Sequence, residues 1–198
     1  MPSDLAQAVA KVEALLLPPD METTAYPVLI MMSGLPGSGK SYLGQRLAEQ
    51  LPAVIIESDR VRKALFLEPV YSAQESTIVH RTCHEVLRRL LRRGIRVIFD
   101  ATNLVEFQRE LLYSLAEHSG AHLLIVRTVA PEHVIRERLE QRKVAGEGAS
   151  DADWRIYHRM SKSEQKIRRT HLCIDTSRDM DEAVQKVVRA VRRCTTGT

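Results

Sequence analysis

The sequence contains few cysteines and few aromatic residues, and both shortages narrow the class of protein. Its 198 residues include three cysteines, Cys83, Cys173 and Cys194, which are far apart and form no C-x-x-C pair. This number and spacing exclude a disulfide framework and a zinc ribbon, so we expect a reducing, cytoplasmic environment. Aromatic residues make up 5% of the chain, which leaves no obvious stacking platform for single-stranded nucleic acid.

Long apolar runs are also missing. The apolar run near the start of the chain, residues 14–17, is too short for a signal peptide or a membrane span. We therefore expect a protein that is not exported and has no membrane partner. The formal net charge of +4 permits an anionic substrate without requiring nucleic acid. No obligate protein partner is evident.

Short β-branched runs alternate with segments of helical periodicity along most of the chain. The runs cover residues 28–33, 53–58, 96–101, 122–129 and 172–175. This alternation predicts an α/β fold of three layers, a parallel sheet with helices on both faces. Residues 1–26 are expected to form an N-terminal helical extension, and residues 27–198 a single domain with a small helical lid at about 138–160.

The helical segments carry apolar stripes that should face a core. Gly94, after two arginines, is typical of a helix C-terminal cap. The predicted buried stripes are Leu43, Leu47 and Leu51; Val79, Cys83, Val86 and Leu90; Phe107, Leu111 and Leu115; and Val184, Val187 and Val191.

The most specific pattern is "GLPGSGKS" at residues 34–41, which matches G-x-x-x-x-G-K-[ST] between a predicted strand and a predicted helix. Glycines let successive backbone N–H groups point inward, and the helix N-terminus adds its dipole, so the segment can hold a polyphosphate. Lys40 would reach the β- and γ-phosphates, and Ser41 would bind Mg²⁺. The expected nucleotide-binding residues are Gly34, Leu35, Pro36, Gly37, Ser38, Gly39, Lys40, Ser41 and Tyr42.

Three polar residues follow the next two predicted strands, where ligands of open α/β sheets bind. Asp59 can accept a proton there, or it can cap the helix predicted at 60–66. Asp100, in "VIFDATN", fits a carboxylate that organises Mg²⁺ through water, or one that binds turn backbone. Asn103 can line the site or cap the helix that begins near residue 105.

Two arginines further along the chain lie four residues apart on one helical face. Arg138 and Arg142 precede a glycine-containing stretch that reaches Ser150 and could form a hinged flap. Such a flap could close over ATP, supplying charge and excluding water. The alternative is a solvated arginine face.

The segments "GLPGSGKS", "SDRVRKAL", "DATN" and "RLEQRK…SDAD" together resemble the small P-loop kinases related to phage polynucleotide 5′-hydroxyl kinase and, more loosely, to zeta-toxin-like kinases. The resemblance covers residues 28–175 and implies ATP as the nucleotide and a sheet order of 2-3-1-4-5. It implies that Asp59 is the general base and that Arg62 holds the acceptor or the γ-phosphate. It further implies that Arg138 and Arg142 contact the nucleotide from a lid and that Asp100 and Asn103 line the site.

The sequence departs from this group at two positions. Tyr42 stands where a threonine is common, so only its backbone N–H would serve the α-phosphate. Arg60 replaces a second acidic residue beside Asp59.

The helix predicted within residues 76–94 carries two histidines and several arginines. His80 and His84 are spaced to share a metal but have no evident third ligand. The neighbouring arginines fit a solvated face through Arg81–Glu85 and Glu85–Arg89 pairs. Trp154 and Tyr157 are expected to be packing residues rather than base-stacking ones, with a role in acceptor binding as the alternative.

Three functions are compatible with these patterns. The first is an ATP- and Mg²⁺-dependent kinase that phosphorylates a hydroxyl of a small molecule, with Lys40, Asp59, Arg62 and Arg138 as its catalytic set. The second is a polynucleotide 5′-hydroxyl kinase, which should bind oligonucleotides with strong salt dependence. The third is a nucleotide-binding regulatory module that would tolerate loss of Asp59.

Overall fold

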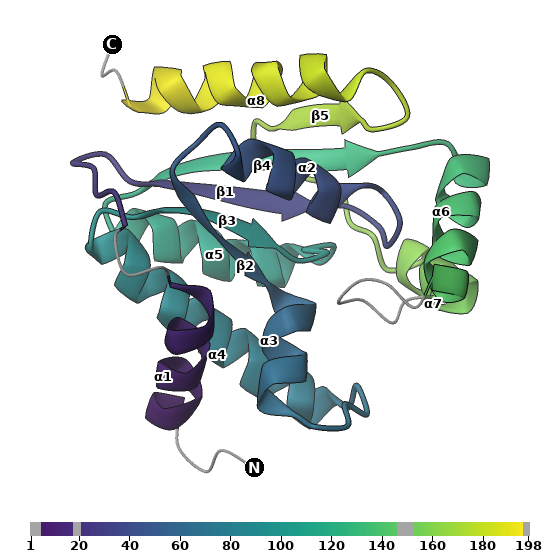
Figure 1. Cartoon of the computed structure of the whole chain (residues 1–198), viewed down its shortest axis with the longest axis horizontal. Helices are drawn as coiled ribbons and strands as arrows, with labels where there is room; N and C mark the ends of the chain where they lie inside the picture. Colours follow the sequence, from purple (N-terminus) through teal and green to yellow (C-terminus); the bar gives the residue numbers. More distant parts are fainter. Residues whose placement is uncertain (1–4, 18–20, 146–152, 196–198) are drawn as a thin grey trace.

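A computed structural model describes residues 5–17, 21–145 and 153–195; side chains of 143–145 are outside this description. The elements in chain order are α1 (Leu5–Leu16), β1 (Val28–Ser33), α2 (Lys40–Ala48), β2 (Ala53–Glu57), α3 (Ser58–Leu65), α4 (Ala73–Arg92), β3 (Arg96–Asp100), α5 (Glu106–His118), β4 (His122–Val129), α6 (Glu132–Ala145), α7 (Trp154–Ser161), β5 (Leu172–Asp175) and α8 (Met180–Thr195). Figure 1 shows α6 and α7 together beyond the carboxyl ends of the strands.

The five strands form one parallel sheet in the order β2-β3-β1-β4-β5, as expected. The predicted strand limits agree with the structure to within one residue at every end. All six residues of β1 are buried, because the central strand is covered on both faces. Parallel pairing brings the carboxyl ends of all five strands to one edge of the sheet. Open α/β sheets bind their ligands at this edge.

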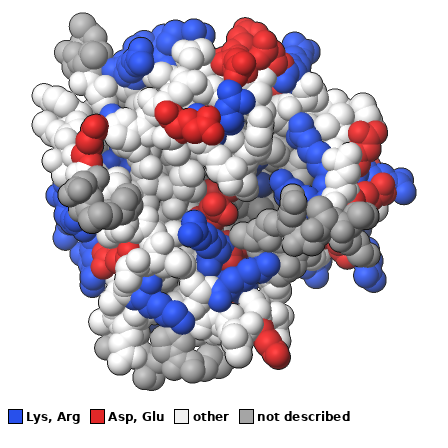
Figure 2. Space-filling model, in the orientation of Figure 1, with Lys and Arg blue, Asp and Glu red and all other residues white. Residues whose placement is uncertain are grey.

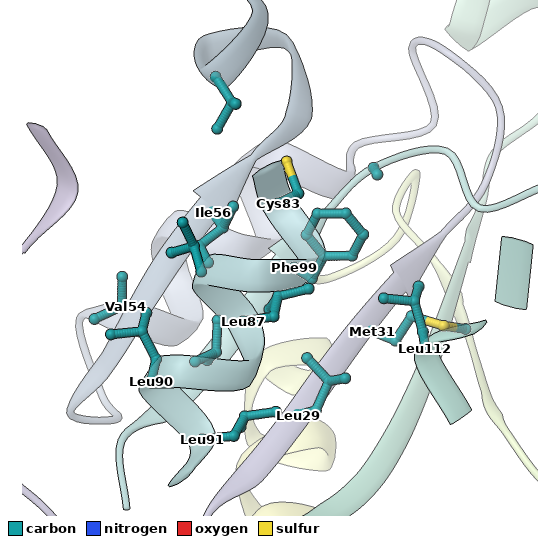
Figure 3. Close-up of a cluster of buried hydrophobic side chains, with 14 of the residues drawn as sticks. Leu29, Met31, Val54, Ile56, Cys83, Leu87, Leu90, Leu91, Phe99 and Leu112 are labelled. Atoms are coloured by element: carbon teal, nitrogen blue, oxygen red, sulfur yellow. The ribbon is translucent and has the colours of Figure 1, made fainter. Parts of the chain in front are cut away.

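Two cores cover the two faces of the sheet, which makes the fold three-layered (Figure 1). On one face Leu29 and Met31 of β1 meet α4 and α5, and Figure 3 shows these side chains converging with Phe99 and Leu112. On the other face Ile30 of β1 packs beneath α2 and α8. Strand alternation sends neighbouring residues of β1 to opposite cores.

The expected buried stripe on α5 is wrong. Phe107 is 71% exposed and Leu111 43% exposed, while Leu115 is only partly buried. The buried face instead carries Leu112 and Ala116, joined by Arg109. Both apolar sets have helical spacing, so the sequence pattern could not tell which of them faces the sheet. The other three predicted stripes are buried in the cores.

The N-terminal helix α1 packs against α4 through Ala8, Val9 and Val12, which are all buried. These side chains belong to the same core as β1 and β3. Gly94 ends α4 with a φ of 76°, as the predicted cap requires. None of the helices that the structure describes is long and apolar enough to cross a membrane.

Candidate active site

The phosphate-binding segment lies between the carboxyl end of β1 and the first turn of α2, as the motif predicts. Gly39 is the N-cap of α2, with a φ of 86°, and has no side chain that could occupy the N–H groups of the first turn. A Cβ at Gly39 would lie 2.8 Å from Thr176 Oγ1, and one at Gly34 would lie 2.6 Å from the Thr128 carbonyl oxygen. The close approach of neighbouring strands therefore requires both glycines.

Two threonines hold the loop in place. The Ser38 and Thr128 hydroxyls share a hydrogen bond of 2.7 Å, and the Thr176 hydroxyl donates to the Ser38 carbonyl at 2.9 Å. Gly34 N–H donates to the Thr102 carbonyl at 3.0 Å. The loop is thus hydrogen-bonded to the ends of β4 and β5 and to the segment after β3, which organises it before any phosphate arrives.

Lys40 is 8% exposed, and its ammonium donates to the Leu35 carbonyl at 3.0 Å, inside the loop. Burial lowers the pKa of Lys40, while the charges of Asp100 and Asp59 act in the opposite direction. These opposing effects place the ammonium within electrostatic reach of both carboxylates. Lys40 therefore combines a hydrogen bond inside the loop with electrostatic contact to the acidic residues of α3 and β3.

Asp100 ends β3 and is 6% exposed, and the strand register pairs it with Glu57 at the end of β2. Burial raises the pKa of the half-buried Glu57, and the nearby Asp100 raises it further. This concentration of negative charge favours a cation. Within the ranges described, no three acidic, histidine or cysteine side chains form a metal cluster. Mg²⁺ needs only one or two protein ligands beside phosphate and water oxygens, so Ser41 and Asp100 fit it.

Asp59 lies in the first turn of α3, directly after β2, and is half-buried. The N-cap of α3 is Glu57 and makes no side-chain capping bond, so the capping reading of Asp59 is wrong. Figure 2 shows acidic side chains where α3 begins, bordered by Lys and Arg side chains. Arg60 and Lys63 are the exposed basic residues of this helix.

Asn103 does not cap α5, whose N-cap is Val105. Asn103 is 3% exposed, and its side-chain amide donates to the Met32 backbone carbonyl at 2.7 Å. Its carbonyl accepts from the Ser33 hydroxyl and from Arg109. Asn103, with a φ of 45°, therefore joins β1 to the segment after β3.

The arginines predicted for a lid lie on α6 in different surroundings. Arg138 donates to the Thr176 hydroxyl and carbonyl, both at 2.8 Å, and to the Gly37 carbonyl at 3.4 Å. Arg142 is half-buried, and its charge lowers the pKa of both Lys40 and Arg138. Arg138 thus stabilises the phosphate loop through hydrogen bonds to Gly37 and Thr176. Arg142 lies close enough to Lys40 for the two positive charges to repel each other. The predicted flap falls mostly on residues 146–152, outside the described residues.

Helices α6 and α7 pack directly on the phosphate loop. Ile135 and Leu139 of α6 form a small buried cluster with Tyr157 of α7, and Leu35 packs against it. Trp154 stacks on Tyr157 with ring centroids 4.7 Å apart. Both aromatic residues pack as expected, and the cluster joins α6 and α7 to the phosphate loop.

Arg62 is 8% exposed and faces α4. Its guanidinium donates to Glu75 at 3.3 Å and to the Ser76 hydroxyl at 3.2 Å, and it lies 4.7 Å from the centre of the Tyr71 ring. The contacts that the structure gives this side chain are thus to α4 and to the connection before it.

His80 and His84 lie on α4 with ring centroids 6.3 Å apart. Desolvation lowers the pKa of both rings, that of His84 to about 4. Glu85 pairs with Arg89 as predicted, but its second ion pair is to Arg88 rather than to Arg81.

Sequence reasoning missed Thr128, Thr176, Glu57 and Arg109. The first three lie at or just after strand carboxyl ends, and that position could have revealed them, as it did Asp59 and Asp100. Arg109 is fully buried and donates to the carbonyls of residues 103, 104, 165 and 166. It joins the segment after β3 to the segment after α7. A lone arginine on a helix gives no sequence signal of such a role.

The class of protein follows from the fold together with the loop: it is an α/β protein of the P-loop type. A family model described as an AAA domain matches residues 29–167, which is more than half of the chain. The chain therefore belongs to this family.

The individual curated relatives have low sequence identity to this chain. The 6-phosphofructo-2-kinase/fructose-2,6-bisphosphatase 1 proteins of Rattus norvegicus and Mus musculus are each 24% identical over 151 residues, covering 66% of this chain and 31% of theirs. The chain thus spans about a third of the length of these curated relatives.

Solved structures share the fold along nearly their whole length. APE1195 has a TM-score of 0.70 and 19% identity, covering 87% of this chain and 98% of its own. A gluconokinase from Sinorhizobium meliloti has a TM-score of 0.62 and 21% identity, with 87% and 95% covered. The APS kinase CysC of Mycobacterium tuberculosis, in complex with AMPPNP and APS, has a TM-score of 0.59 and 22% identity, with 85% and 99% covered.

Proposed function

We propose that the protein is an ATP-dependent kinase that transfers the γ-phosphoryl group to a hydroxyl of a small molecule. The observation that carries the proposal is the meeting of Lys40, Asp59 and Asp100 at one edge of the sheet, beside the phosphate loop. The kinase names of the relatives and of two structural neighbours support it. The particular relation to phage polynucleotide 5′-hydroxyl kinase stays a prediction.

The loop amides and the Lys40 ammonium bind the β- and γ-phosphates of ATP, and Arg142 faces the same phosphates from α6. Asp59 accepts the proton of the acceptor hydroxyl as its oxygen attacks phosphorus. The new O–P bond forms as the bond between the γ-phosphorus and the bridging oxygen breaks, and ADP leaves with that electron pair. Arg138 acts on the loop rather than on the phosphates. A regulatory module would need no carboxylate at the position of Asp59.

Mg²⁺ bound by Ser41 and by Asp100, the latter through water, would neutralise the charge of the phosphate oxygens. The Asp100 carboxylate is nearly buried and lies beside Glu57, so a divalent cation also relieves the repulsion between the two acids.

The test is transfer of label from γ-labelled Mg-ATP to gluconate, fructose 6-phosphate, adenylyl sulfate and a 5′-hydroxyl oligonucleotide. We expect one of the small molecules to be labelled. Asp59→Asn should lower kcat at least about a hundredfold, since a positioned general base contributes 10² to 10⁴, while the Kd for ATP stays within about twofold.

The matched control is Glu68→Gln, an exposed acid beyond the end of α3. It should transfer at the wild-type rate. Equal transfer by Asp59→Asn and wild type would remove Asp59 from the mechanism. Label on the oligonucleotide alone would establish the polynucleotide kinase instead.

A further inference from the structure

One charged network outside the phosphate loop holds the connection between α3 and α4. The Glu75 carboxylate is 6% exposed and accepts from the backbone N–H groups of Val70, at 3.0 Å, and Tyr71, at 2.7 Å. It also pairs with Arg62 at 3.3 Å. A single carboxylate thus gathers two backbone donors and one guanidinium, which joins the connection to both helices.

The backbone of Tyr71 needs this support. Its φ is 55°, a conformation that residues other than glycine rarely adopt. Strained backbone persists only where the surroundings determine it. Here two contacts hold Tyr71 in this conformation. Its N–H donates to Glu75 at 2.7 Å, and its ring lies against the Arg62 guanidinium.

The same network leaves Arg62 little freedom to bind a substrate. One terminal nitrogen donates to Glu75, the other to the Ser76 hydroxyl, and the Tyr71 ring lies against the guanidinium. The remaining Nε is buried and makes no hydrogen bond within the part of the chain that is described. Moving this side chain to a ligand would remove the positive charge beside the Glu75 carboxylate and leave it only the N–H groups of Val70 and Tyr71, which is unfavourable.

We infer that Arg62 is a positioning residue: paired with Glu75, it fixes the orientation of α3 and thereby aims Asp59, one helical turn earlier, at the acceptor. The inference rests on the proposed function only for the role of Asp59. Helix α3 has eight residues, and Val61 and Leu65 attach one side of it to the core. The Arg62–Glu75 pair attaches it to α4, and the two attachments together set its rotation about its own axis.

The first readout needs no acceptor. Hydrogen exchange of the full chain is measured in Glu75→Gln, Arg62→Met and the milder Arg62→Lys, with Glu68→Gln as the matched control. We expect the Val70 and Tyr71 amides to exchange about tenfold faster in Glu75→Gln, since a hydrogen bond to a charged group is worth at least that factor. Exchange in α3 should also rise in Glu75→Gln and Arg62→Met, and exchange in residues 34–41 should not. Unchanged exchange in α3 would overturn the inference.

The second readout uses whichever acceptor of the transfer panel is labelled. Arg62→Met and Glu75→Gln should lower kcat by similar factors with unchanged acceptor KM, and Arg62→Lys should recover part of the loss. A rise in acceptor KM confined to Arg62→Met would show that Arg62 contacts the acceptor instead. If the wild type labels no acceptor, the kinase proposal fails, and hydrogen exchange still decides whether the pair holds α3. Should Arg62→Met not fold, Arg62→Lys and Glu75→Gln carry both comparisons.

Discussion

Single residues decide how the site is charged. Burial lowers the pKa of Lys40, the charges of Asp100 and Asp59 oppose that effect, and Glu57 is a third acid beside Asp100. The motif predicted Lys40 from sequence, since its chemistry requires that residue at that spacing. Glu57 escaped prediction because its importance comes from strand register, which pairs it with Asp100 across two strands distant in sequence. Arg62 was predicted as a contact of the acceptor or the γ-phosphate. Its pairing with Glu75 was not predicted, because Glu75 belongs to another helix.

One residue outside the site should make stability depend on pH. The folded-state pKa of His84 is about 4, against 6.5 for the ordinary side chain, because burial disfavours the imidazolium. Between these values the unfolded chain binds a proton that the folded chain does not, so stability falls as the pH drops from 6.5 towards 4. We expect urea unfolding of His84→Gln to show a weaker loss over this window. An identical pH dependence in variant and wild type would contradict the assignment.

At the scale of elements, periodicity predicted the strands well and one helix face badly. The strand limits followed from β-branched runs ended by polar residues, which have few alternative readings. On α5, Phe107 and Leu111 offered an apolar stripe that competes with Leu112 and Ala116. The fully buried Arg109 lies on the same face as Leu112, and its bonds to residues 103–104 and 165–166 favour the observed rotation of the helix. Such long-range contacts leave no local pattern.

The rotation of α5 makes a stability prediction. Leu112→Ala should lower the free energy of unfolding by about 2–5 kcal/mol, because it empties part of the core. Phe107→Ser should change it by less than about 0.5 kcal/mol, because its side chain is 71% exposed. Chemical denaturation of both variants measures the difference. Comparable losses at the two positions would mean that α5 buries its other face.

Helix α6 makes a second prediction, because its two arginines differ in their contacts. Arg138→Ala removes two 2.8 Å bonds to Thr176 and should cost about 2 kcal/mol of stability. Arg142→Ala should leave stability within about 0.5 kcal/mol and lower the rate of phosphate transfer instead. Thermal unfolding and transfer assays on both variants separate the effects. If Arg142→Ala lost stability and Arg138→Ala lost only transfer, Arg142 would be the structural residue and Arg138 the one that acts on the phosphates.

For the whole molecule, the sheet brings distant segments to one edge. The loop after β1, the acids at the ends of β2 and β3, and the threonines at the ends of β4 and β5 meet there because all strands are parallel. Helices α6 and α7 pack on the same edge through Leu35 and the cluster around Tyr157. The order of the strands could be predicted only through the family resemblance, because alternation of strand and helix is compatible with several orders. The site's overall position followed from that order.

The central claim is that this edge transfers phosphate rather than only binding nucleotide. The most direct measurement is ³¹P NMR of the wild-type protein with Mg-ATP and the mixed acceptors, beside a reaction without acceptor. We expect ADP and a phosphate-monoester signal to appear together, at a rate well above the hydrolysis seen without acceptor. ATP that is bound but unchanged, or ADP with inorganic phosphate and no new phosphate monoester in both reactions, would contradict the claim.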